Sequence, residues 1–247
     1  MKIFKAKVIL FLFVLLTIGK MTAQESRFKE GETINVWAAS GLNMRDKPDA
    51  KGQKLATIPY GAKVLVQTNI GVKVPFEIEE FKGFTVKGYW LLVKYGNTEG
   101  FVFDGFLSRL PIPKNTKSTK PDEPSGIADY LKTLKKVGKV YDIEKCKELD
   151  FLKDTCVYKQ RYEYGIVLKD IIYPEVGGGF DLTIPNISLY EGYFLIKFYY
   201  FDEGNDKCIY DAKKKTVGIL PQDEGVGCHS DIYIKNNVLI IENYCGC

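Results

Sequence analysis

The residues of this chain whose types could do chemistry are its six cysteines and its single histidine. Cys228 and His229 are sequence neighbours, and a thiol nucleophile needs a base within hydrogen-bond distance to take its proton. Neighbouring residues point to opposite faces of a strand, so this pair does not bring thiol and imidazole together. Any Ser/His/Asp set would also depend on His229, because the chain has no other histidine. No catalytic residue is predicted.

Metal binding and disulfide formation are the other possible uses of the cysteines. Four possible zinc ligands are Cys228, His229, Cys245 and Cys247. Their spacing differs from the Cys-x₂₋₄-Cys pattern of zinc sites, so neither a metal site nor a cofactor is predicted. In an exported protein, six cysteines predict three disulfides, with fifteen possible connectivities. We expect Cys146 to pair with Cys156, and Cys245 and Cys247 to tie the terminal strand to earlier segments. The predicted disulfide residues are Cys146, Cys156, Cys208, Cys228, Cys245 and Cys247.

Export is indicated by the N-terminus. Three lysines within the first seven residues precede an unbroken apolar run over residues 8–16, and Thr22 and Ala23 follow. This order is typical of a secretory signal peptide, and the run is shorter than the roughly 20 residues of a membrane-spanning helix. We expect cleavage near Ala23, removal of residues 1–23, and a periplasmic or extracellular product with no membrane insertion. No cysteine follows the cleavage region, so a lipid-modified N-terminus is not expected.

The net charge of the expected mature chain does not favour nucleic acid as a partner. The chain has 35 Lys and Arg against 31 Asp and Glu, but residues 1–23 hold four of the lysines and no acid. The remaining 31 bases balance the 31 acids, and no Lys/Arg block provides the positive patch that nucleic acids require. No polybasic or amphipathic stretch indicates binding to a membrane surface either.

Composition divides the mature chain into two domains. Residues 111–125 contain four prolines and almost no apolar side chains, which predicts a linker. Before it, residues 32–110 contain short stretches in which apolar and polar side chains alternate, as in half-buried strands. These stretches are residues 34–38, 54–58, 62–66, 89–95 and 100–103. Five short strands separated by turn residues predict a small β-barrel.

Specific motifs in residues 32–110 are similar to the bacterial SH3 (SH3b) family. They are GLNMR at residues 41–45, Pro48, IPYG at 58–61, WLLV at 90–93 and EGFV at 99–102. The resemblance implies an SH3-like barrel used for recognition, with cell-wall (peptidoglycan) peptide or glycan as the first ligand class and a protein as the second. Two departures are a longer connection over residues 69–87 and Phe101 in place of Trp or Tyr. Aromatic side chains too numerous for a small core indicate a binding surface, and we expect it at Tyr60, Tyr89 and Trp90.

The C-terminal domain, residues 126–247, resembles no family that we recognise. A short helix is predicted from Ile127, with Ser125 as its N-cap. Strands are predicted over residues 162–173, 180–184, 193–201, 208–210, 216–220, 231–235 and 238–242. They describe a disulfide-bonded antiparallel β domain with one or two short helices, arranged as a sandwich or half-barrel. Asn236 and Asn237 predict a tight hairpin, because asparagine tolerates left-handed backbone angles.

The sequence as a whole is mainly β, and we interpret it as an exported, non-enzymatic binding protein. Its ligand would be peptidoglycan or a cell-surface protein. Two alternatives remain open. One is a cell-wall hydrolase that uses Cys228 and His229, and the other is a secreted inhibitor of hydrolases.

Overall fold

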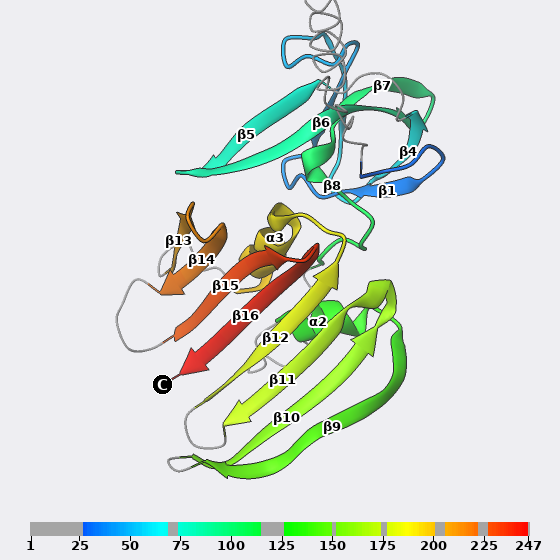
Figure 1. Ribbon diagram of the computed structural model, residues 1–247. Helices are drawn as coiled ribbons and strands as arrows, with labels where there is room; N and C mark the ends of the chain where they lie inside the picture. Colours follow the sequence, from blue (N-terminus) through cyan, green and yellow to red (C-terminus); the bar gives the residue numbers. More distant parts are fainter. Residues whose placement is uncertain are drawn as a thin grey trace, which may run out of the picture.

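Two antiparallel β-sheets and two α-helices make up the regular structure in the described part of the chain. The structure is a computed structural model that describes residues 27–68, 74–114, 126–149, 152–173, 177–200, 206–221 and 227–246. Each half of the chain forms one sheet, and helix α3 lies between the two (Figure 1). The expected mainly β fold class is confirmed. The expected signal peptide, residues 1–23, lies outside the described residues, as does most of the expected linker.

The N-terminal sheet runs in the order β3-β2-β7-β6-β4-β1-β8, and β5 pairs with β6 alone. Its strands are β1 (Thr33–Val36), β2 (Leu42–Arg45), β3 (Lys54–Ile58), β4 (Lys63–Thr68), β5 (Pro75–Phe81), β6 (Phe84–Tyr95), β7 (Thr98–Phe103) and β8 (Leu107–Ser108). A 3₁₀ turn, η1 (Asp104–Phe106), joins the last two. All five predicted strands are present. Alternate residues such as Ile34, Val36 and Met44 are fully buried, which is why the period-two pattern was visible.

The long connection over residues 69–87 contains a β-hairpin. Strand β5 pairs with the first part of β6, from Phe81 opposite Phe84 to Pro75 opposite Tyr89. The second part of β6 then pairs with β4 and β7 inside the main sheet. The hairpin therefore projects beyond the sheet, above α3 in Figure 1, and its tip residues Phe81 and Phe84 both contact the ring of Tyr193.

The C-terminal sheet runs in the order β13-β14-β15-β16-β12-β11-β10-β9. Its strands are β9 (Lys136–Leu149), β10 (Leu152–Tyr162), β11 (Val167–Tyr173), β12 (Gly177–Pro185), β13 (Asp206–Asp211), β14 (Thr216–Pro221), β15 (Gly227–Lys235) and β16 (Val238–Gly246). The helices are α2 (Ile127–Lys132) and α3 (Leu189–Tyr200), and η2 (Glu163–Gly165) is a 3₁₀ turn. Both helices lie on the same side of this sheet (Figure 1). The expected sandwich is therefore wrong, because helices and not a second sheet cover the apolar face.

Turn signals were reliable in this half, whereas the N-cap of α2 and two strands were predicted wrongly. The Asn236–Asn237 hairpin is confirmed, with positive φ at both residues and Lys235 opposite Val238. Helix α2 begins at Ile127 as predicted, but its N-cap is Gly126 and not Ser125, and no side chain caps it. Strand β9 and nearly all of β10 were not predicted. Strand β9 is an edge strand with six lysine or glutamate positions that dilute its alternation.

Helix α3 corrects the prediction of a strand over residues 193–201. Its sequence, LYEGYFLIKFYY, is rich in aromatic residues that favour strands, and it shows no clear polar face. The helix is buried between the two halves, so neither side needs to be polar. The overlooked signal was a capping box, since the Ser188 N–H and hydroxyl each donate to the Glu191 carboxylate at 2.7 Å.

Gly192 lets α3 approach the C-terminal sheet closely. A Cβ at this position would lie 2.5 Å from Leu239 Cδ2 and 2.9 Å from Ile232 Cγ2, and both of these side chains are fully buried. Gly192→Val is therefore expected to lower the free energy of unfolding by about 1–3 kcal/mol through overpacking. Urea unfolding followed by circular dichroism measures the change. An unchanged midpoint would show that the helix–sheet spacing relaxes without cost.

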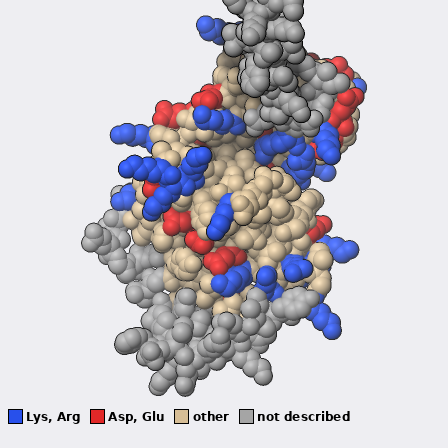
Figure 2. All heavy atoms as spheres, viewed as in Figure 1, with Lys and Arg blue, Asp and Glu red and all other residues tan. Residues whose placement is uncertain are grey.

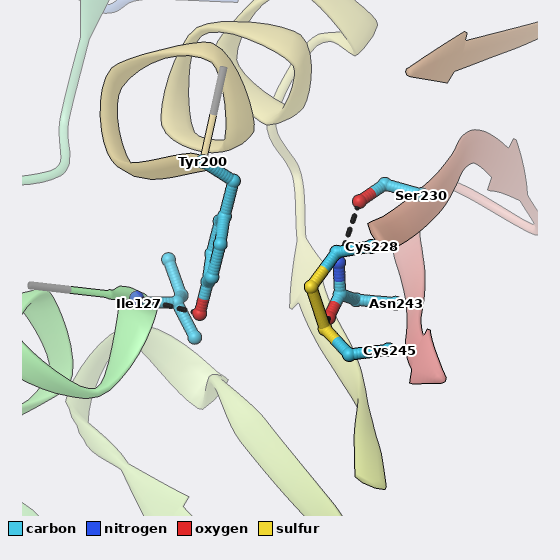
Figure 3. Close-up of a disulfide and its surroundings, with 6 residues drawn as sticks. All are labelled: Ile127, Tyr200, Cys228, Ser230, Asn243 and Cys245. Carbon is cyan, nitrogen blue, oxygen red and sulfur yellow. Dashed lines mark hydrogen bonds between the residues drawn. A yellow bond between two sulfur atoms is a disulfide. The ribbon is translucent and has the colours of Figure 1, made fainter. Parts of the chain in front are cut away.

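The disulfide between Cys228 and Cys245 joins neighbouring strands. The two residues are directly opposite in the β15–β16 ladder, with their Cα atoms 4.1 Å apart. Figure 3 shows the disulfide beside the Asn243–Ser230 hydrogen bond and close to Tyr200, whose hydroxyl accepts a hydrogen bond from the Ile127 N–H at 3.0 Å. The prediction that Cys245 ties the last strand to an earlier one is confirmed. A disulfide is typical of oxidising, exported compartments.

The other cysteines divide into three cases. Cys208 is a free cysteine, so the prediction that it belongs to a disulfide is wrong. It lies on β13 under α3, where its thiol and the Tyr193 hydroxyl are hydrogen-bonded. The side chains of Cys146 and Cys156 lie outside the described part, and their pairing stays a prediction that the β9–β10 register favours. Cys247 also lies outside it.

The two halves share one hydrophobic core, which α3 completes. Phe194 on α3 packs against the rings of Trp37 and Tyr60, at centroid distances of 5.7 and 6.0 Å. Tyr190 packs 4.9 Å from Phe106 in the same way. These contacts place α3 as a structural element of both halves. Among the described residues, no helix combines the length and the apolar character needed to cross a membrane.

A buried polar network reinforces this junction. The Arg27 guanidinium donates to the Glu191 carboxylate on α3, and also to the carbonyl oxygens of Leu107 at 2.5 Å and Asp104 at 3.1 Å. Burial raises the pKa of the Asp104 carboxyl above its ordinary value, although the hydrogen bond from the Tyr89 N–H and the charge of Arg27 act in the opposite direction. Charge pairing therefore accompanies apolar packing where the halves meet.

Candidate functional site

A cleft of about 610 Å³ lies between the two halves. Its walls come from the β1–β2 loop and strand β2, from the β5–β6 hairpin, from η1 and β7, and from helix α3. Its lining is formed by Ala38, Ala39, Ser40, Gly41, Leu42, Asn43, Arg45, Ala50, Phe76, Ile78, Glu80, Trp90, Phe103, Phe106, Tyr190, Phe194, Lys197 and Phe198. A concave, mostly apolar hollow with a few polar groups is the usual form of a ligand site.

One wall is a single face of α3. Tyr190, Phe194, Lys197 and Phe198 line the cleft, and their spacing of four, three and one residues keeps them on one side of the helix. Tyr190 and Phe194 are largely buried, whereas Phe198 is partly exposed, so the wall runs from the core towards solvent. The predicted strand would have sent alternate residues to opposite sides, and only the helix brings these four together.

A second wall is one face of strand β5. Phe76, Ile78 and Glu80 alternate with the exposed Glu77 and Glu79, so the first three face the cleft. The ring of Phe76 lies 5.2 Å from Trp90 and 5.3 Å from Phe103. The hairpin in the long connection therefore supplies one wall of the cleft.

The polar edge of the cleft comes from residues 40–45. Leu42 and Met44 point into the core, so Asn43 and Arg45 share the outer face of β2. Arg45 Nη1 donates to the Gly52 carbonyl oxygen at 2.6 Å, and Asn43 Oδ1 accepts from the Thr57 hydroxyl at 3.2 Å. Arg45 thus anchors the β2–β3 loop, whereas Asn43 bonds across to strand β3, and both residues line the cleft.

Charges on the lining are unequal in number. Two cations, Arg45 and Lys197, accompany one carboxylate, Glu80. Lys197 Nζ lies 3.8 Å from Glu80 Oε1 and 5.4 Å from the centre of the Tyr193 ring. Burial raises the pKa of the Tyr190 hydroxyl, which therefore stays protonated at neutral pH. The lining carries a net positive charge.

The structure separates the three aromatic residues that the sequence grouped as ligand contacts. Trp90 lines the cleft, although its side chain is only 5% exposed. Tyr60 does not line the cleft; its ring packs on Phe194, and its hydroxyl donates to the Pro113 carbonyl oxygen at 2.7 Å. Tyr89 is half-buried and is not among the residues of the cleft lining. Their roles in binding stay predictions, and the geometry favours Trp90.

Several lining residues had escaped sequence reasoning. Phe76, Ile78 and Glu80 carried an alternating pattern that could have revealed a strand in the long connection. Phe194, Lys197 and Phe198 could have been grouped only by recognising the capping box before α3. Even then, no local signal tells which side of that helix meets the N-terminal half.

The alternative site at Cys228 and His229 lacks its nucleophile. The Cys228 sulfur is bonded to Cys245, so it offers no thiolate. His229 Nε2 lies 3.3 Å from Asp231 Oδ2 on the exposed side of β15, with both side chains more than 40% exposed. The hydrolase hypothesis based on this pair is therefore wrong. Within the described ranges, no group of His, Cys, Asp or Glu is arranged to hold a metal ion.

Positive and negative side chains are interspersed on the face shown in Figure 2, and uncharged surface lies between them. The cleft between the halves is the strongest candidate site in the described part of the chain, because it is concave and lined by aromatic side chains.

Comparisons of this chain with protein-family models, with curated proteins and with solved structures find no match.

Proposed function

We propose that this chain is an exported, non-enzymatic binding protein that holds a cell-wall (peptidoglycan) ligand in the cleft between its two halves. The observation that carries the proposal is the aromatic-lined cleft of about 610 Å³, which has the size and lining of a ligand site. The similarity of residues 32–110 to the bacterial SH3 family supports cell wall as the ligand source. The apolar N-terminal run and the disulfide support a periplasmic or extracellular location.

The cleft is suited to binding because its aromatic walls are rigid before a ligand arrives. Trp90, Phe103 and Phe194 are each less than 10% exposed, so packing fixes their side chains. Phe76 and Phe198 are partly exposed and leave apolar surface for a ligand to cover. Preformed aromatic surface lowers the ordering cost of association. Because α3 supplies one wall, the site requires both halves.

Phe76→Ala is expected to weaken retention on purified insoluble peptidoglycan by about tenfold or more, the usual size for a buried aromatic anchor. The experiment incubates the mature protein with the insoluble material and quantifies protein in solution before and after. Tyr158→Ala is the matched control, because Tyr158 is an aromatic residue 40% exposed on β10 and outside the cleft lining. Equal retention of both variants and the wild type would show that peptidoglycan does not bind in the cleft. Failure of the wild type to be retained would exclude the cell-wall ligand.

A protein ligand is the second candidate, and one feature favours it. Strand β5 pairs only with β6 among the described residues, so its other edge offers backbone groups beside the cleft. An extended segment of a partner, such as a hydrolase that this protein inhibits, could add to that edge. Loss of peptidoglycan retention together with capture of a hydrolase would support this candidate.

A further inference from the structure

The side chain of Arg45 is the polar group of the cleft with most binding capacity left. It lies on the outer face of β2, is partly buried and contributes to the lining. Its Nη1 donates a hydrogen bond to the Gly52 carbonyl oxygen at 2.6 Å. A guanidinium has five N–H donors in a planar fork, so this bond orients the group and leaves donors for a ligand.

The charge balance of the lining points to an anionic ligand group at Arg45. Lys197 already faces the Glu80 carboxylate, at 3.8 Å, and lies over the Tyr193 ring. Glu80 therefore offsets Lys197, and Arg45 supplies the remaining positive charge of the lining. An Arg fork matches a carboxylate in geometry, because two parallel N–H groups reach its two oxygens.

The surroundings of Arg45 indicate what the carboxylate is attached to. Residues 38–41, Ala-Ala-Ser-Gly, form the adjoining edge of the cleft, where the exposed Ala39 and Ser40 have small side chains beside which a peptide main chain can lie. Apolar surface from Phe76, Ile78 and Trp90 lines the same hollow. A ligand that matches the Arg45 guanidinium, the edge of small residues and the apolar lining has a free carboxylate, a peptide bond and an apolar side chain.

We infer that the cleft binds the carboxyl terminus of a cell-wall peptide, with the terminal carboxylate on Arg45 and the apolar last side chain against the aromatic wall. This inference rests on the proposed function of the same cleft and names its ligand group. Glycan strands lack this combination, because they have no peptide main chain that ends in a free carboxylate. Protein carboxyl termini share the chemistry but end in L-residues, whereas cell-wall peptides end in D-residues.

The test uses the full mature protein and N-acetylated tripeptides that end in D-alanine, as the free acid and as the C-terminal amide. Isothermal titration calorimetry gives affinities at one ionic strength, and a change in tryptophan fluorescence, from Trp37 and Trp90 together, is a second readout of binding. We expect the free acid to bind about tenfold or more tightly than the amide, since a charge-assisted bidentate pair is lost in the amide. In Arg45→Gln the acid and amide should bind alike. Arg161→Gln is the matched control, because Arg161 is an exposed arginine on β10, and it should keep the full difference.

The outcomes separate this inference from the proposed function. Equal binding of acid and amide to the wild type would overturn carboxylate recognition, and this comparison does not depend on how well any variant folds. Retention on insoluble peptidoglycan without peptide binding would also overturn it, while the cleft function would stand. Tighter binding of the L-alanine acid would reassign the ligand to protein termini. Binding of neither peptides nor peptidoglycan would remove the proposed function itself.

Discussion

Replacing Glu191 with alanine is expected to lower the free energy of unfolding by about 3–5 kcal/mol, the usual cost of removing one partner from a buried ion pair. The Glu191 side chain is only 1% exposed and accepts hydrogen bonds from Arg27 and from both the N–H and the hydroxyl of Ser188. Its loss leaves the Arg27 guanidinium without its carboxylate partner and removes the carboxylate half of the capping box of α3. Because α3 joins the two halves, both should unfold together at a lower urea concentration.

The control for this prediction is Glu77→Ala. Glu77 also forms an ion pair, with Lys87 at 3.1 Å, but the two side chains are 55% and 71% exposed. Solvent screens such a pair, so its removal should cost no more than about 1 kcal/mol. Similar midpoints for the two variants would mean that the buried network at the junction contributes little. Glu191→Gln, which keeps an acceptor for Ser188 but loses the charge, should lie between them.

Replacing Cys228 and Cys245 together by serine is expected to lower the free energy of unfolding by about 2–4 kcal/mol. The disulfide closes a loop with a sequence separation of 17, and opening it increases the conformational freedom of the unfolded chain. The ladder between β15 and β16 continues on to Lys235 and Val238, so the strands should still pair in the folded variant. Urea unfolding at neutral pH measures the difference.

The Cys208→Ser variant is the comparison for the disulfide prediction. Cys208 is free, so this substitution should alter stability far less than the double replacement. Counting thiols on the folded wild-type protein provides an independent check. No thiol should be found at Cys228 or Cys245 by modification and mass mapping, and a reactive Cys228 would contradict the structure and reopen the thiol-hydrolase hypothesis. Burial raises the pKa of the Cys208 thiol, which should make it slow to react at neutral pH.

The lining of the cleft comes from both halves of the chain. Arg45 and Phe76 come from the N-terminal half, whereas Phe198 and Lys197 come from α3 in the C-terminal half. A fragment that contains only residues 24–113 lacks one wall and would expose Trp37 and Tyr60, which pack on Phe194. Binding experiments therefore require the whole mature chain.

Sequence alone determined the parts of this protein whose signals are local. Alternation located β1, β3 and β4, and short apolar stretches between turn residues located β6 and β7, which are buried on parts of both faces. Asn236 and Asn237 predicted their hairpin because left-handed backbone angles suit asparagine. The chemistry of exported cysteines predicted a disulfide at Cys245, although it did not identify the partner.

Only the tertiary structure decided the parts that depend on what packs against each segment. Helix α3 shows no amphipathic period because it is apolar towards both halves, and its aromatic residues suggested a strand. The cleft joins Arg45, Phe76 and Phe198, which are separated by up to 153 positions in the chain. Cys208 lacks a disulfide because β13 places it beneath α3, against Tyr193. Periodicity reports how one segment is buried, whereas a binding site depends on which segments meet, and long-range packing alone determines that.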